Sequence, residues 1–127
     1  MTIQLGVLGV GHLASALLDG VLEHGVVSAE EVLLMDLDAG RTAPFARRGC
    51  QVASDAAALA AAPRLLLSVR PQSFADAAGA LGALTESNLV ISVMAGGTSE
   101  HIRSMLGGCC RVVRVMPNTA AAVGESM

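Results

Sequence analysis

The sequence predicts an α/β fold in which helices cover both faces of a doubly wound, mostly parallel sheet. Short apolar runs alternate with longer amphipathic stretches along the 127 residues. The short runs are apolar throughout, which is typical of strands that are buried on both faces. Hydrophobic residues make up 53% of the chain and charged residues 15%, a balance that argues against disorder. The length fits one domain, so we expect a single dinucleotide-binding domain over residues 1–127.

The apolar runs and their punctuation place each element in order. We expect strands at residues 3–8, 31–35, 51–53, 65–69, 88–93 and 111–115. We expect helices at residues 12–23, 39–48, 55–61, 71–81 and 99–106, and a loop-like tail at 116–127. Ser54 and Thr98 are predicted N-caps, whereas Gly25, Gly49 and Gly107 are predicted to end helices. Right-handed crossovers between these strands give the doubly wound arrangement.

Charge and composition exclude several classes of function. The chain has 8 Lys and Arg against 11 Asp and Glu, lacks Trp and Tyr, and has only two Phe, so we expect no nucleic-acid partner. It has no apolar run of about 18 residues, so we expect no membrane partner, and its start reads as mature protein. The three cysteines, Cys50, Cys109 and Cys110, predict core or near-core filling in a reducing compartment, which we take to be the cytoplasm, without a metal site.

A glycine-rich turn joins the first predicted strand to the first helix. The segment Leu8-Gly9-Val10-Gly11-His12-Leu13-Ala14 has the spacing G-x-G-x-x-A. Gly9 permits the tight turn, Gly11 allows the backbone to approach a pyrophosphate, and Ala14 lets the helix lie close to the strand. Free N–H groups at the helix start would bind the phosphates. The turn therefore predicts a Rossmann-like dinucleotide site.

An acidic residue and a basic residue follow the second strand. Asp36, 25 positions after Gly11, is expected to accept hydrogen bonds from an adenosine ribose, and its charge favours NAD over NADP. Arg41 favours NADP if its side chain folds over the ribose, and it is better placed for this than Arg47 or Arg48. A surface charge on the helix is an equally good interpretation of Arg41. The sequence leaves the choice between NAD and NADP open.

The histidines do not indicate catalysis. His12 lies beside the expected pyrophosphate, where a backbone-positioning role fits better than a catalytic base. His24 and His101 stand near a helix end and a helix start with no obvious partner, and we assign them no chemistry. We predict no catalytic residue in this chain.

Three further loops follow predicted strands and would meet at the same edge of the sheet. They are the segments 68–72, 94–98 and 116–119, each rich in small or turn-forming residues. Gly96 and Gly97 allow the backbone to lie close to a flat ring, and Asn118 and Thr119 offer polar groups to a small ligand. Ordinary turn chemistry explains any one of these loops, but less easily all three together.

Taken together, these segments resemble Δ1-pyrroline-5-carboxylate reductase over nearly the whole chain. The matching elements are the glycine turn, Ser68-Val69-Arg70-Pro71, Ser92 through Thr98, and Val113 through Thr119 with its Met-Pro-Asn-Thr element. The resemblance implies hydride transfer from NAD(P)H to the imine carbon of pyrroline-5-carboxylate, the last step of proline biosynthesis. It also implies roles by position: pyrophosphate binding by Gly9, Gly11, His12, Leu13 and Ala14; a border of the cofactor path by Val69, Arg70 and Pro71; nicotinamide contacts by Ala95 and Gly96; and substrate contacts by Pro117, Asn118 and Thr119.

The chain departs from that family in several places. The family usually has Lys where this chain has Arg70, and Pro where it has Ala120. An Asn that is common near the start of the third helix in the family is replaced here by Ser54 or Asp55. Family members also continue into a helical domain that dimerises and completes the substrate pocket, so the resemblance implies that these 127 residues are the nucleotide-binding half alone. We therefore expect an incomplete enzyme that binds cofactor with little turnover, tends to self-associate, and forms a homo-oligomer where the helical domain is present.

Proteins with three other functions contain a similar glycine turn. A non-catalytic NAD(P)-binding regulatory module would have every glycine discussed above. A dehydrogenase that reduces NADP with a deazaflavin shares the opening fingerprint but fits Met116 to Thr119 less well. A methyltransferase does not normally keep the Gly-x-x-Ala spacing at the helix start.

Overall fold

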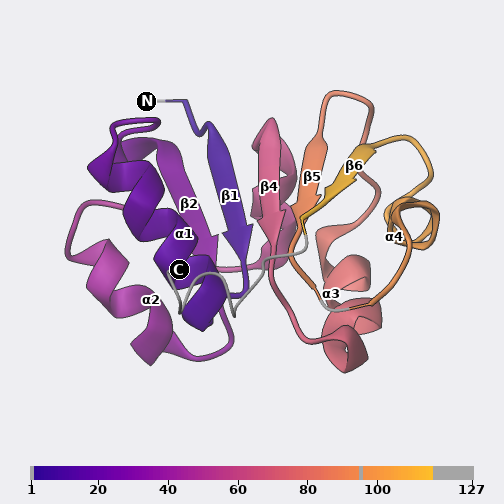
Figure 1. The fold of residues 1–127 in the computed structure, drawn as a ribbon, viewed down its shortest axis with the longest axis horizontal. Helices are drawn as coiled ribbons and strands as arrows, with labels where there is room; N and C mark the ends of the chain where they lie inside the picture. The colour runs from indigo at the N-terminus through magenta and orange to yellow at the C-terminus, as the bar shows by residue number, and fades with distance from the viewer. Residues whose placement is uncertain (1, 95, 116–127) are drawn as a thin grey trace, which may run out of the picture.

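Six parallel strands form one sheet in the order β3-β2-β1-β4-β5-β6, as Figure 1 shows for this computed structural model. The structure describes residues 2–94 and 96–115. The order reverses between β1 and β4, which is the switch point where such sheets bind ligands. The prediction of a doubly wound parallel sheet is confirmed. The strands are Leu5–Leu8 (β1), Val32–Met35 (β2), Gln51–Val52 (β3), Arg64–Leu67 (β4), Leu89–Ser92 (β5) and Arg111–Arg114 (β6).

The helices lie between the strands as expected, with two differences of type. The segment predicted as a helix over 55–61 is a 3-10 helix, and the helix predicted over 71–81 begins as one. A short segment between a cap and Pro63 favours the tighter 3-10 turns. The α-helices are His12–Glu23 (α1), Ala39–Ala46 (α2), Phe74–Leu81 (α3) and Ser99–Met105 (α4), and the 3-10 helices are Ala29–Glu31, Ala56–Ala61 and Pro71–Ser73.

Of the five predicted helix boundaries, those at Thr98, Gly25 and Gly107 are confirmed, Gly49 lies beyond the end of α2, and Ser54 is wrong. Thr98 accepts a hydrogen bond from the His101 amide at 3.0 Å, and Gly25 and Gly107, with φ +68 and +98, directly follow the C-caps of α1 and α4. Gly49 has φ +105, but α2 already ends at Ala46. Ser54 is not the cap of its segment, because Asp55 is the extended residue whose side chain accepts from the Ala58 amide at 3.1 Å. The true cap is therefore one residue later than predicted.

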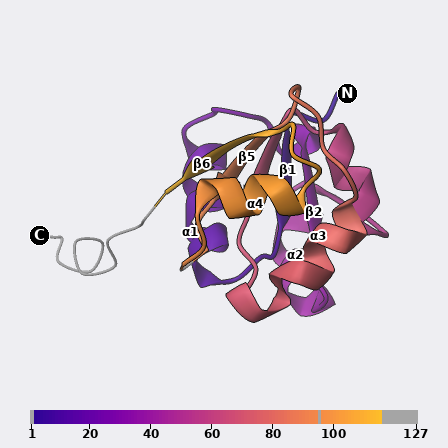
Figure 2. The same cartoon turned by 90° about the vertical axis from the view of Figure 1, so that its right-hand side faces the viewer.

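Two apolar cores lie on the two faces of the sheet. Val7 of β1 and Leu18 of α1 belong to the core under α1 and α2, whereas Leu65 and Leu67 of β4 belong to the core under α3 and α4. All four side chains are at most 1% exposed. In Figure 2, α1 and α3 lie on opposite sides of the sheet. Each buried side chain of this size contributes about 1.5–3 kcal/mol, so both helix layers are held firmly against the strands.

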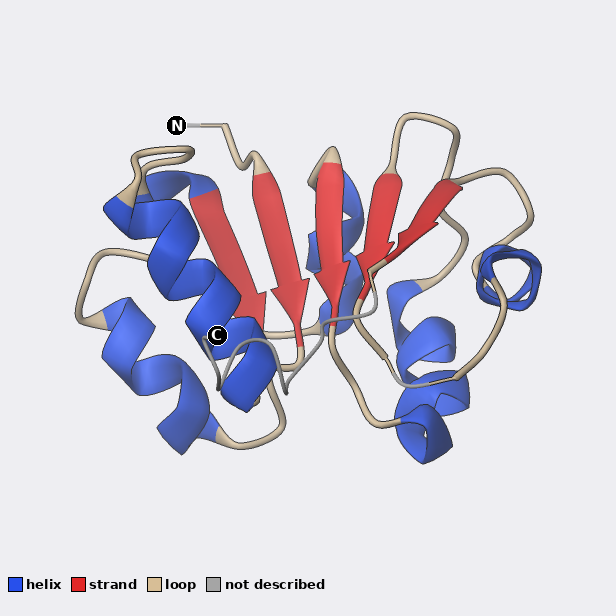
Figure 3. Cartoon of the chain, in the orientation of Figure 1, coloured by secondary structure: helices blue, strands red, loops and turns tan. Residues whose placement is uncertain are grey.

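The parallel strands bring their carboxyl ends to one edge of the sheet, as the arrows in Figure 3 show. The loops that follow β1, β2 and β4 therefore lie together at this edge. In the part of the chain that the structure describes, the longest helix has 12 residues, and none has the length and hydropathy of a bilayer-spanning segment.

Candidate functional site

The glycine turn after β1 packs directly on the backbone of the loop after β4. Gly9 has φ +90, a conformation that L side chains rarely adopt. A Cβ added there would lie 2.5 Å from the carbonyl oxygen of Ser68, so the two backbones can approach only because Gly9 has no side chain. The Gly9 amide donates to the Met35 carbonyl at 2.9 Å, and the Ser68 amide donates to the Leu8 carbonyl at 2.9 Å. These contacts fix the ends of β1, β2 and β4 together.

The N-terminus of α1 presents backbone amides that the helix itself does not use. Gly11 is its N-cap with φ −84 and offers no side-chain acceptor, and the Ser15 amide makes the first bond, to the Gly11 carbonyl at 2.9 Å. The amides of the first turn, at residues 12–14, have no acceptor within the helix. Ala14 is fully buried against the sheet, and no acidic residue occupies the first turn. This arrangement suits an anionic ligand.

Asp36 ties the glycine turn to the end of β2. Its Oδ2 accepts a hydrogen bond from the Val10 amide at 2.7 Å, and its Oδ1 accepts one from the Asp38 amide at 2.8 Å. The Asp36 side chain is 10% exposed. The sequence predicts a ribose contact for this carboxylate but gives no sign of the bond to Val10. Asp36 therefore holds the turn in place, whatever else it binds.

Arg41 is the arginine of α2 that reaches the site. Its Nη1 lies 4.0 Å from Asp36 Oδ2, and its Nε lies 3.8 Å from Asp38 Oδ2. Asp38 also caps α2, because its Oδ1 accepts from the Gly40 amide at 2.9 Å. Arg48 points elsewhere: it forms an ion pair with Asp19 of α1 and stacks over the Phe45 ring at 5.5 Å.

A cleft of about 640 Å³ opens at the switch point, within the usual size range of small-molecule sites. Its walls come from the ends of β1, β2 and β4 and from the starts of the segments that follow them. Leu37 stands at the cleft with its side chain 98% exposed. The lining residues are Leu8, Gly9, Met35, Asp36, Leu37, Asp38, Arg41, Ala56, Ser68, Val69, Arg70, Ser73, Asp76, Ala77 and Ala80.

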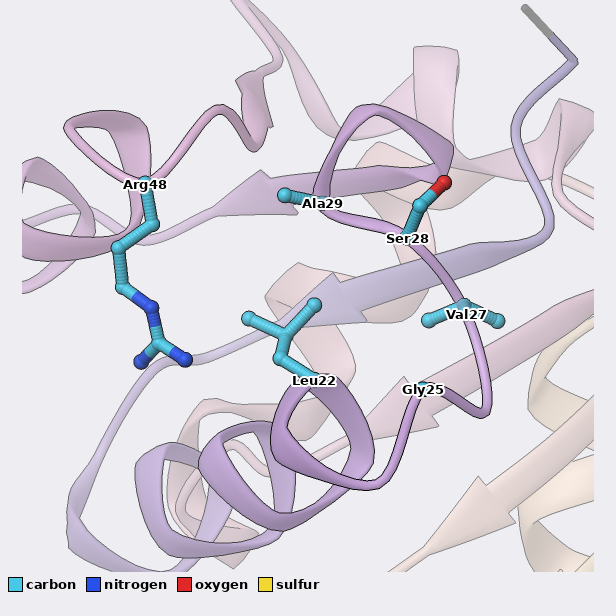
Figure 4. Close-up of a pocket in the computed structure, with 6 residues that line it drawn as sticks. All are labelled: Leu22, Gly25, Val27, Ser28, Ala29 and Arg48. Atoms are coloured by element: carbon cyan, nitrogen blue, oxygen red, sulfur yellow. The ribbon is translucent and has the colours of Figure 1, made fainter.

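A smaller hollow of about 380 Å³ adjoins the cleft at Arg41, which lines both. It lies between α1 and α2, and Gly11 and His12 contribute to its wall. A third hollow of about 390 Å³ lies at the far end of α1, between Leu22 and Ala29 (Figure 4). That hollow shares no lining residue with the cleft, so it is separate from the glycine turn.

The remaining predicted site residues differ in where the structure places them. Val69 and Arg70 line the cleft, whereas Pro71 is exposed at the start of the 3-10 helix that follows. Leu13 is half-buried and packs against the core, so its amide rather than its side chain is the group available to a ligand. Gly96 is exposed and has φ +79. Because it has no side chain, its backbone could lie close to a flat ring. Ala95, Pro117, Asn118 and Thr119 lie outside the described residues.

The histidines and cysteines have structural surroundings. His24 Nδ1 lies 2.9 Å from the Gly20 carbonyl oxygen, and His101 packs edge-on against Phe74 at 6.2 Å, so both have partners that the sequence did not reveal. Cys50 and Cys110 are buried as predicted, and burial raises the pKa of both thiols. Cys109 is exposed, so the expectation of core filling is wrong for this residue.

Sequence reasoning missed several residues that line the cleft, and three of them add charge or apolar surface. Asp38 and Asp76 add carboxylates, and Leu37 adds an apolar surface at its edge. Asp38 could have been found, because an Asp directly before a predicted helix is a common N-cap. Asp76 gave no comparable signal, since its place depends on how α3 packs against the strands.

Comparisons with known proteins agree with this fold. Curated pyrroline-5-carboxylate reductases from Haemophilus influenzae and Methanosarcina acetivorans are each 34% identical to this chain, over 94% and 97% of its length and 45% and 47% of theirs. The solved structure of a pyrroline-5-carboxylate reductase from Coxiella burnetii superposes with a TM-score of 0.83 at 26% identity, over 97% of this chain and 47% of that one. The corresponding Plasmodium falciparum structure, with NADP bound, gives 0.78 at 25% identity, over 96% and 45%.

These matches confirm the resemblance to pyrroline-5-carboxylate reductase that the motifs predict. The chain spans about half the length of the curated relatives it matches. A model of one protein family matches residues 4–96, which include the glycine turn, Asp36 and the loop after β4. The chain therefore belongs to the family described as NADP oxidoreductase, coenzyme F420-dependent.

Proposed function

We propose that the cleft at the switch point binds NAD(P) and that this chain is the dinucleotide-binding part of a pyrroline-5-carboxylate reductase. The observation that carries the proposal is the cleft itself, where the glycine turn, the Asp36 corner and the loop after β4 meet. The family description and the NADP-bound relative support the choice of cofactor.

The residues present fit a dinucleotide. The diphosphate would lie against the amides of the first turn of α1, at the open face of Gly11, where an added Cβ would meet only the Arg41 Nη1 atom within 4 Å, at 3.9 Å. The adenosine ribose would lie beside Asp36, and the adenine against the exposed Leu37. Val69 and Arg70 would border the path from the adenosine to the nicotinamide.

When bound, NAD(P)H supplies the hydride, and the protein supplies orientation and exclusion of water. The proposed acceptor is the imine carbon of pyrroline-5-carboxylate, and the product is proline. Among the described residues, we assign no proton donor to the imine nitrogen and no anchor for the substrate carboxylate. Pro117, Asn118 and Thr119 stay candidates for substrate contacts from the sequence alone.

We infer that the 127-residue chain binds cofactor with little or no turnover, since positioning of both reactants is needed for hydride transfer. In a longer form of the protein that has the helical domain, a homo-oligomer would complete the substrate site. We expect the protein to act in the cytoplasm, with a small-molecule substrate as its partner.

The alternative is a non-catalytic module that binds NAD(P) and regulates another protein. It shares the cleft, so cofactor binding does not separate the two proposals. Reduction of pyrroline-5-carboxylate by a longer form of the protein would favour the enzyme. The curated relatives that we compared are pyrroline-5-carboxylate reductases, which also favours that activity over the reduction of NADP with a deazaflavin.

A Gly11→Ala variant tests cofactor binding without disturbing the fold. Its Cβ makes only ordinary contact, so we expect a stability loss of about 1 kcal/mol or less. The same Cβ would stand where the diphosphate approaches, so affinity for NADH and NADPH should fall at least about tenfold. Nicotinamide fluorescence titration measures both affinities.

Gly20→Ala is the matched control, because it lies in the same helix with nothing within 4 Å of its added Cβ. It should bind cofactor as the original chain does. Equal affinities for the Gly11→Ala chain and the original chain would refute diphosphate binding at this turn.

A further inference from the structure

We propose that the corner between β2 and α2 selects a dinucleotide whose adenosine ribose carries a free 2′-hydroxyl, so that this chain prefers NADH to NADPH. The inference rests on the proposed function and assigns selectivity to Asp36, with Asp38 as a second contributor. It runs against the cofactor named in the family description and bound by the Plasmodium falciparum relative.

Asp36 is a fixed carboxylate. Its two oxygens accept from the Val10 and Asp38 amides at 2.7 and 2.8 Å. Val10 is 2% exposed, so rotation of Asp36 away from the ribose would leave a buried N–H without an acceptor. The carboxylate therefore cannot turn aside to make room for another anion.

The same geometry leaves Asp36 able to bind a hydroxyl. Each carboxylate oxygen has two acceptor positions, and one backbone amide occupies one position on each. A ribose 2′-hydroxyl can donate a hydrogen bond to one of the acceptor positions that the two amides do not occupy. A phosphate at neutral pH offers mainly acceptor oxygens and negative charge. The Asp36 carboxylate has no proton to donate to it and repels it as a like charge.

Arg41 is the group that could attract a 2′-phosphate, but two carboxylates already share its charge. Its guanidinium lies 4.0 Å from Asp36 and 3.8 Å from Asp38. On the opposite wall, Arg70 and Asp76 offset each other in formal charge. The cleft is thus lined by three carboxylates and two guanidinium groups, which leaves one net negative charge.

Titration of the full chain with NADH and with NADPH, followed by nicotinamide fluorescence, measures this selectivity directly. We expect NADH to bind at least about tenfold more tightly. Rising salt, from about 0.05 M to about 0.5 M, should reduce the ratio because it screens the repulsion of the 2′-phosphate. Equal affinities, or tighter binding of NADPH, would overturn the preference and leave the proposed function standing. Absence of binding by both cofactors would overturn both.

Asp38→Asn and Asp55→Asn form a matched pair of variants. Both residues cap a helical segment through Oδ1, and Asn preserves such a cap, but only Asp38 lines the cleft. We expect Asp38→Asn to shift the affinity ratio toward NADPH by about threefold and Asp55→Asn to leave it unchanged. Asp36→Asn should shift it further, by about tenfold. Equal shifts at Asp38 and Asp55, or no shift at Asp38, would contradict the assignment.

Discussion

Two of the walls of the cleft are built in different ways. The glycine wall, Leu8 to Gly11, runs from the cleft into the adjoining hollow. It is backbone packed on backbone, and an added Cβ at Gly9 would collide with Ser68. The acidic corner, Asp36 to Arg41, is made of charged side chains, of which Asp36 alone is mostly buried. The first wall offers amides to any diphosphate. The second wall presents carboxylates, which accept a hydrogen bond from a hydroxyl but repel a phosphate.

This difference separates folding from selectivity. Changes in the glycine wall act through sterics and backbone conformation, so they should affect stability or all dinucleotides equally. Changes in the acidic corner should affect one dinucleotide more than another. Asp36 is the exception that joins the walls, because its carboxylate accepts the Val10 amide.

The largest expected effect belongs to Gly9→Ala. The variant combines φ +90 with a contact of 2.5 Å to the Ser68 oxygen, and we expect a loss of about 2–4 kcal/mol in the free energy of unfolding. Gly25→Ala has φ +68 with nothing within 4 Å, so it should lose only about 1 kcal/mol. Urea unfolding measures both. Equal losses would mean that the close approach to Ser68 contributes nothing.

A smaller effect is expected where the two walls meet. Asp36→Ala removes the acceptor of the Val10 and Asp38 amides and should lower the free energy of unfolding by about 1.5–3 kcal/mol. Asp38→Ala removes an exposed N-cap and should cost about 1 kcal/mol. Chemical unfolding of the two variants side by side tests the order. A larger loss for Asp38→Ala would show that the tie between the walls is unimportant.

The smallest effect concerns the other end of β2, where charge serves folding alone. Hydrogen bonds from the Ser28 amide and hydroxyl lower the pKa of Glu31. A lowered pKa means that the stabilisation is present at neutral pH and is lost as pH falls through the pKa of the folded state. The difference in unfolding free energy between the original chain and Glu31→Gln should therefore shrink in acid. A difference that is independent of pH would contradict this role.

Local signals in the sequence predicted most of the fold. The range of α1, the cap at Thr98 and the end of α1 before Gly25 all follow from residues within a turn of the feature they determine. The prediction of a helix over 55–61 was less accurate, because Ser54 and Asp55 are both good N-caps and only the backbone conformation decides between them.

The site was predicted less completely because its side-chain contacts join distant segments. Asp36 and Val10 are 26 positions apart, and Arg48 and Asp19 are 29 apart. Such pairs depend on how α1, α2 and β2 pack, which no local pattern records. The sequence could place an acidic residue at the end of β2, but not the backbone amides that hold it.

Amide NMR of the full chain, titrated with NADH, tests the central claim most directly. If the diphosphate binds the glycine wall, the amides of residues 11–14 should show the largest shift changes, with those of Gly9 and Val10 also affected. The chemical shifts of the amides near Gly25, beside the separate hollow of Figure 4, should not change. Shifts confined to that hollow, or no shifts at residues 11–14 at saturating NADH, would contradict the account.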